Sequence, residues 1–205
     1  MDLLEDAEPA LAAAARRKPD DPSYQYTLAA AKVGKHQFQA AQGLLEAILR
    51  KKPDDPQIQY ALGSVSYLNG QLTDAAAHLR ESVRLQPEQL ASYYYLALIV
   101  RDQGNEPEAI RTLEELLGRY PDHAPSCEVL GSLLISAQRY SEAQSYLEKA
   151  VRLNPQSMKA NYQLGLLLAR MGKKNEADKW LKVAESLRKD EATSRLQLRL
   201  LDPDQ

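Results

Sequence analysis

Prolines, alanines and leucines recur at one constant interval along most of this chain. The prolines that mark the interval are Pro19, Pro53, Pro87, Pro121 and Pro155. Residues 52–56 repeat residues 18–22 letter for letter, and alanines and leucines recur in the same frame. A period of about 20 to 50 residues is typical of a solenoid, in which each unit packs only on its neighbours. The interval therefore constrains the fold more than any single residue does.

Each unit is predicted to hold two short helices. In the second unit we expect the first helix over about Gln57–Asn69 and the second over about Leu72–Arg84. Asp55 can cap the first helix, and Gly70 can adopt the left-handed backbone that ends it. Leu and Ala are far commoner than the β-branched residues that strands prefer. The expected fold class is therefore all-α.

The units resemble the tetratricopeptide repeat (TPR) family, whose signature is a helix–turn–helix with Leu-Gly, a Tyr, an Ala, an aromatic residue and a closing Pro. The Leu-Gly or Leu-Ala pair begins at Leu28, Leu62, Leu96, Leu130 and Leu164. The signature Trp is replaced by Gln25, Gln59, Tyr93, Cys127 and Asn161. Lys189 stands where the last Pro is expected. The resemblance implies a right-handed α-solenoid of tandem helix–turn–helix repeats.

The resemblance covers residues 22–190 as five repeats. Their predicted bounds are 22–55, 56–89, 90–123, 124–157 and 158–190. Residues 2–18 stand in the frame of a second helix whose first helix is missing, so we expect a partial repeat or an N-terminal cap there. Such a start suggests a piece of a longer protein. Residues 191–201 are leucine-rich and are expected to form a C-terminal capping helix, with the first helix of a sixth repeat as the alternative.

The sequence holds no recognisable set of catalytic or metal-binding residues. His36, His78 and His123 lie at dissimilar places in different units, with no carboxylate or cysteine at ligand spacing. Cys127 occupies a packing position and is expected to be a small buried hydrophobe. Phosphate-binding loops and nucleophile motifs do not occur. We therefore expect that the protein is not an enzyme and uses neither cofactor nor metal.

A row of tyrosines is the best candidate for a binding site. Tyr26, Tyr60, Tyr94 and Tyr162 stand two residues before the Leu-Gly or Leu-Ala pair of their repeats, and Glu128 breaks the row. The resemblance places this row on the concave surface, which first helices line in TPR solenoids. The predicted partner-binding residues of that face are Tyr26, Tyr60, Tyr67, Tyr94, Arg101, Lys159, Tyr162 and Arg170. The alternative is that these tyrosines brace adjacent first helices.

The groove is expected to be more apolar and aromatic than charged. Chaperone-binding members of the family hold a C-terminal carboxylate with Lys, Arg and Asn on three consecutive first helices. Of the corresponding positions in this chain, only Lys159 carries a matching residue. A clamp for chaperone tails is therefore not expected.

The leading functional hypothesis is a non-catalytic scaffold that binds a peptide or partner protein segment in the concave groove. The alternatives are a self-assembly module, with a homo-oligomer formed through the incomplete N-terminal repeat, or a partner-recruiting arm of a larger enzyme, sensor or secretion protein. A net charge of −2 and no basic stripe with interleaved aromatics argue against nucleic acid. No apolar run reaches the roughly 18 residues that membrane insertion needs. We expect a soluble chain and favour a cytoplasmic location.

Overall fold

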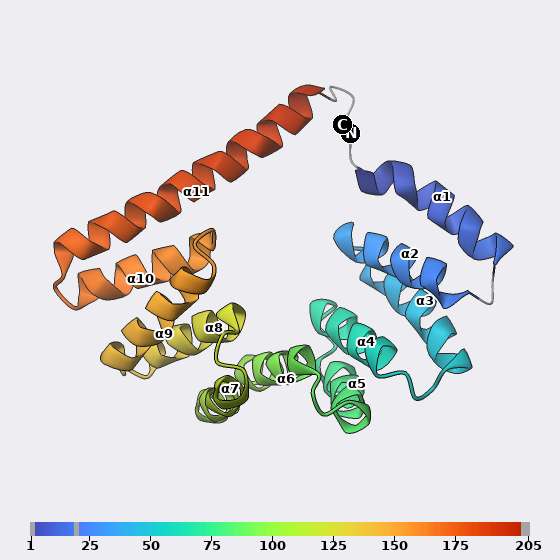
Figure 1. Cartoon of the computed structure of the whole chain (residues 1–205), viewed down its shortest axis with the longest axis horizontal. Helices are drawn as coiled ribbons and strands as arrows, with labels where there is room; N and C mark the ends of the chain where they lie inside the picture. Colours follow the sequence, from blue (N-terminus) through green and yellow to red (C-terminus); the bar gives the residue numbers. More distant parts are fainter. Residues whose placement is uncertain (1–2, 19–20, 202–205) are drawn as a thin grey trace. The chain divides into compact units, whose positions relative to one another are not determined.

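The computed structural model describes residues 3–18 and 21–201, with side chains over 9–18 and 21–189 (Figure 1). Every regular element in these ranges is an α-helix. Contacts between Cα atoms divide the chain into two compact units, Met1–Gln103 and Gly104–Gln205. The boundary falls in the turn between the two helices of the third repeat.

The first unit is a series of helices that pack in chain order. Its helices are α1 (Leu3–Arg17), α2 (Pro22–Gly34), α3 (Phe38–Lys51), α4 (Pro56–Leu68), α5 (Leu72–Leu85) and α6 (Leu90–Asp102). Helices α2 and α3 form one hairpin and α4 and α5 the next, and α6 contacts both α4 and α5. Helix α1 packs on α2 as α3 packs on α4.

The second unit repeats the same arrangement. Its helices are α7 (Glu106–Arg119), α8 (Ala124–Ser136), α9 (Tyr140–Leu153), α10 (Met158–Arg170) and α11 (Lys174–Leu201). Helices α8 and α9 form one hairpin and α10 and α11 another, while α10 also contacts α8 and α9. The prediction of an all-α array of tandem helical hairpins is confirmed.

The two ends of the array differ from the repeats between them. The predicted partial repeat at 2–18 corresponds to α1, of which residue 2 and the side chains before residue 9 lie outside the described part. The helix expected at 191–201 has no separate start, because α11 runs without a break for 28 residues. Lys189 replaces the proline that follows earlier second helices, so the backbone meets no block there. The capping role of 191–201, whose side chains are not described, stays a prediction.

Capping side chains and left-handed residues set where the helices begin and end. The Asp55 carboxylate accepts hydrogen bonds from the backbone N–H groups of Gln57 and Ile58, at 3.0 and 3.2 Å. Gly70, with φ of +77°, provides the turn after α4. In the first repeat His36 takes this left-handed role with φ of +57°, a conformation that is costly for a residue with a Cβ.

The hairpins depend on close approach between their two helices. A Cβ added to Gly63 would lie 2.5 Å from Leu79 Cγ, and one added to Gly131 would lie 2.6 Å from Leu147 Cγ. Gly165 in α10 has the same environment. Leu79 and Leu147 are fully buried. The absence of a side chain on the first helix thus makes room for a leucine of the second.

At the position of the missing signature Trp, a side chain joins three of the first helices, α4, α8 and α10, to the loop before them. Gln59, Cys127 and Asn161 each donate a hydrogen bond to the carbonyl of the proline in the preceding loop, at 3.3, 3.9 and 3.0 Å. Cys127 is fully buried, as expected, and burial raises the pKa of its thiol. Three different residue types therefore make the same structural contact at this position.

Replacing Gly131 with alanine should destabilise the protein. The new Cβ would overlap Leu147, and overpacking of this kind costs about 1–3 kcal/mol even though alanine favours helices. Urea unfolding followed by circular dichroism would measure the loss. Gly118→Ala is the matched control in the same unit, because its Cβ would meet no atom within 4 Å. Equal stability of the two variants would contradict this account of the hairpin.

Candidate functional site

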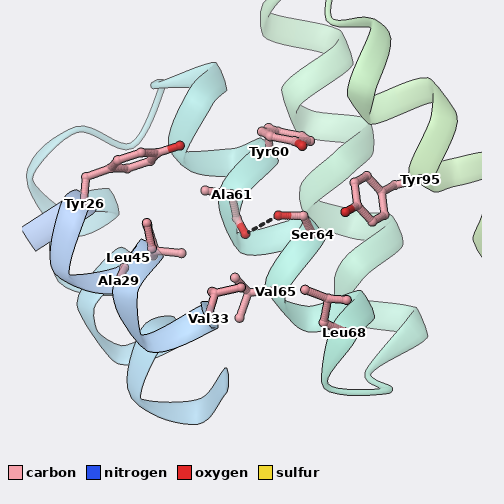
Figure 2. Close-up of a pocket in the computed structure, with 11 residues that line it drawn as sticks. Tyr26, Ala29, Val33, Leu45, Tyr60, Ala61, Ser64, Val65, Leu68 and Tyr95 are labelled. Carbon is pink, nitrogen blue, oxygen red and sulfur yellow. Dashed lines mark hydrogen bonds between the residues drawn. The ribbon is translucent and has the colours of Figure 1, made fainter. Parts of the chain in front are cut away.

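An apolar pocket lies in the first unit between α2 and α4 (Figure 2). Its volume is about 230 Å³. The rings of Tyr26, Tyr60 and Tyr95 stand along one side, and Val33 and Val65 lie on the other (Figure 2). None of the residues that line it carries a formal charge at neutral pH. The pocket can therefore receive an uncharged group.

The pocket exists because a large side chain of the next interface has no counterpart here. In that interface Tyr95 of α6 lies against Tyr60 and Tyr67 of α4, with ring centroids 6.1 and 5.4 Å apart. The residue that occupies the place of Tyr95 one repeat earlier is Ala61, which lines the pocket. The same frame therefore places an aromatic ring between α4 and α6 but only a methyl group between α2 and α4.

A polar network joins the C-terminal ends of α4 and α6. The Tyr67 hydroxyl donates to Asp102 Oδ2 at 2.7 Å and accepts from Arg101 Nη2 at 3.2 Å. Arg101 is also ion-paired with Asp102 at 2.7 Å. Burial, together with the hydrogen bond to the Asp102 carboxylate, raises the pKa of Tyr67 to about 12. Two predicted ligand contacts, Tyr67 and Arg101, are thus engaged with each other.

The first-unit tyrosines of the predicted row differ in their surroundings. Tyr26 is 39% exposed and stands at the pocket. Tyr60 also lines the pocket but is half-buried and contacts Tyr95. Tyr94 meets Tyr95 edge-on, with centroids 5.7 Å apart. Of these three first-unit tyrosines, Tyr26 is therefore the most available to a partner, whereas Tyr60 and Tyr94 also pack within the fold.

The remaining predicted residues belong to the second unit. Lys159 is ion-paired with Glu128 at 2.9 Å, and Glu128 also accepts a hydrogen bond from Ser157 at 2.7 Å. Glu128 is the residue that breaks the tyrosine row, so the break supplies a partner for Lys159. Tyr162 is 52% exposed, and Arg170 is exposed at the end of α10.

The sequence prediction named Tyr26 and Tyr60 but missed the other residues that line the pocket. Ala61 and Leu68 line it, and Tyr95 completes the rim from α6. A comparison of side-chain volume at equal positions of the repeats would have indicated it, because Ala61 stands where the next repeat has the ring of Tyr95. The row of tyrosines alone gives no such signal.

Other candidate chemistry in the described residues is structural. His78 shares a 2.7 Å hydrogen bond with Gln59, and burial lowers its pKa. Among the residues of 3–18 and 21–201 whose side chains are described, no group of three His, Cys, Asp or Glu is arranged to hold a metal ion. No helix in those ranges combines the length and apolar character that a bilayer crossing requires.

Sequence comparison decides the family. Models of the tetratricopeptide repeat match residues 26–89, 69–124 and 134–200. The chain belongs to the tetratricopeptide repeat family. Repeats of this family are generally protein-interaction modules and are usually non-catalytic. No curated protein sequence matches this TPR chain.

Solved TPR structures share the fold at low sequence identity. MamA from Desulfovibrio magneticus RS-1 is 18% identical with a TM-score of 0.66, over 83% of this chain and 97% of its own. TTC0263 from Thermus thermophilus is 23% identical with a TM-score of 0.66, over 86% and 100%. YrrB, described as a TPR protein with an unusual peptide-binding site, is 16% identical with a TM-score of 0.59, over 93% and 98%.

Tyr67 should make stability depend on pH in the alkaline range. Its folded pKa of about 12 lies above the ordinary value of 10. Its contribution to the free energy of unfolding is therefore fully present below pH 10 and is lost as the pH rises to about 12. The variant Tyr67→Phe lacks this titration. The difference in unfolding free energy between wild type and variant, measured in urea, should therefore shrink above pH 10. A difference that stays constant from pH 9 to 11.5 would contradict the network.

Proposed function

We propose that this TPR chain is a non-catalytic scaffold that binds a peptide or partner protein segment along its first helices. The observation that supports this most is the uncharged pocket between α2 and α4, with the exposed ring of Tyr26 at its edge. Tyrosine offers apolar area and a hydroxyl with few rotatable bonds, which suits side-chain recognition. The repeat family itself supports a protein partner.

The groove extends beyond the pocket. A second hollow of about 450 Å³ shares Tyr26 and lies between the first turns of the same two helices. Ser23 and Thr27 border it from α2, and Asp55 and Gln57 border it from the start of α4. Helix α2 has 13 residues and is about 20 Å long. An extended peptide of about six residues would span that length.

Useful affinity requires several contacts at once. An aromatic pair contributes about 0.5–1.5 kcal/mol beyond its buried area, whereas micromolar binding corresponds to about 8 kcal/mol. The apolar pocket offers contacts to apolar side chains, and the more polar hollow beside Asp55 offers hydrogen bonds. Arg101 and Lys159 already have acidic partners in the chain, so their role toward a ligand is secondary.

Self-association is the second candidate function, and the observation that favours it is on α10. Met158, Tyr162 and Leu166 are 39%, 52% and 45% exposed. Each stands one helical turn after the previous one, a spacing that gathers the three side chains on one helix face. Large contiguous apolar patches are uncommon on monomers and often mark interfaces. A second copy of the chain would cover this stripe.

Removing the Tyr26 ring should weaken peptide binding with little effect on folding. Random peptides would be selected on the full chain by display, and the affinity of an enriched peptide measured by calorimetry. Tyr26→Ala should lower that affinity about tenfold, which is about 1.4 kcal/mol. The control is Tyr24→Ala on the same helix, where the ring lies under Lys18 instead. Enrichment of no peptide, or equal affinity for the Tyr26 variant, would refute the proposal.

The stripe on α10 predicts a mass that rises with concentration. Light scattering from about 10 to several hundred micromolar, which covers micromolar dissociation constants, should show a dimer. Leu166→Glu should restore the monomer by placing a charge in the stripe. Leu153→Glu is the control, because Leu153 is 37% exposed but lies on α9. A wild-type monomer at every concentration would remove self-association as a function.

A further inference from the structure

We propose that the α2–α4 pocket selects an aromatic side chain, Phe or Tyr, carried by the bound partner segment. This inference rests on the proposed function and names the residue class that the groove recognises. Three properties of the pocket carry it: the occupant of the equivalent space one repeat later, the volume, and the charge of the lining.

The chain itself shows what fills this space. Between α4 and α6 the space is filled by Tyr95, which packs on Tyr60. Leu98, one turn further along α6, is buried. At the same two positions one repeat earlier stand Ala61 and Ser64. The interface between α2 and α4 therefore lacks one aromatic ring and one branched aliphatic group.

The surface that would receive the missing ring is still present. Tyr26 is the counterpart, one repeat earlier, of Tyr60, the residue on which Tyr95 packs. Tyr26 is at the pocket edge and exposed (Figure 2). An incoming ring would meet Tyr26 as Tyr95 meets Tyr60, and contacts between rings of this kind favour an aromatic over an aliphatic group.

The volume suits one six-membered ring. A protein cavity of about 150 Å³ is large enough to bind benzene, and this pocket measures about 230 Å³. Sites for whole drug-sized ligands start at about 300 Å³. The pocket therefore fits a single side chain that is attached to a longer partner.

The lining excludes a charged occupant. Its polar side-chain atoms are tyrosine hydroxyls and the Ser64 hydroxyl, which already donates to the Ala61 carbonyl at 2.9 Å (Figure 2). A buried ammonium or carboxylate without a partner would suffer a large loss of hydration energy. Charge complementarity thus favours a neutral ring, and the rim hydroxyls can bond the phenol of a tyrosine.

The experiment fills the pocket with the side chains that the chain itself has at the equivalent positions of the next repeat. Ala61→Tyr copies Tyr95, and Ser64→Leu copies Leu98 and fills the pocket from a second position if the first variant folds poorly. Ser64→Ala is the matched control that leaves the pocket open. Melting curves of the full chain establish that each variant is folded.

Two readouts are taken on these chains. The first is titration with p-cresol, a tyrosine side-chain analogue, followed by methyl NMR signals of Val33 and Val65. The second is the sequence of peptides selected by display on the wild-type chain. We expect p-cresol to shift both valine signals in wild type and Ser64→Ala but not in the filled variants. Selected peptides should share an aromatic residue, and replacing that residue by leucine should weaken binding to the wild-type chain about tenfold. The same replacement should leave the affinity for the Ala61→Tyr chain unchanged.

The outcomes separate this inference from the proposed function. Peptides that bind in a Tyr26-dependent way but share no aromatic residue, or that bind the filled variants as tightly as wild type, would overturn the aromatic pocket and leave the scaffold function intact. Failure of the wild-type chain to select any peptide would overturn both.

Discussion

The structure depends on one repeated contact, in which a small residue of the first helix of a hairpin lies against a leucine of the second helix. Gly63 makes room for Leu79 and Gly131 for Leu147, while Ala29 and Leu45 share a buried cluster in the first repeat. A larger side chain at the small position would separate the two helices. Because the contact recurs in the first, second, fourth and fifth repeats, the two helices of those hairpins come together in the same way. Neighbouring interfaces between first helices therefore differ in only a few side chains.

One position in this frame shows how a solenoid varies its surface without changing its fold. Ala61 leaves a pocket, Tyr95 fills the corresponding space with a ring, and Gln163 in the second unit donates a hydrogen bond to Ser132 at 3.1 Å. These residues occupy equal places in successive or alternate repeats, so the helix packing that supports them is the same. The groove therefore results from a local loss of side-chain volume on a regular scaffold. This also explains why the pocket is apolar: its base is the hydrophobic core of the hairpins.

The periodic features of the fold were predictable, and the contacts between repeats were not. Proline and glycine positions, with capping residues such as Asp55, predicted the hairpins because those effects act within a few residues of the chain. The tyrosine row placed Tyr26 and Tyr60 on one face. That Tyr67 would engage Arg101, or Lys159 pair with Glu128, depends on distances between helices. Such distances follow from packing, which the spacing of residues in one chain does not give.

The account's central claim is that the space between α2 and α4 is open whereas that between α4 and α6 is filled by Tyr95. A crystal structure determined under xenon pressure tests this most directly, because xenon occupies apolar cavities of this size. The account predicts a xenon atom beside Ala61, between Val33 and Val65, and none between Tyr60 and Tyr95. A pocket closed by the ring of Tyr26 or Tyr60, with no xenon bound, would contradict it.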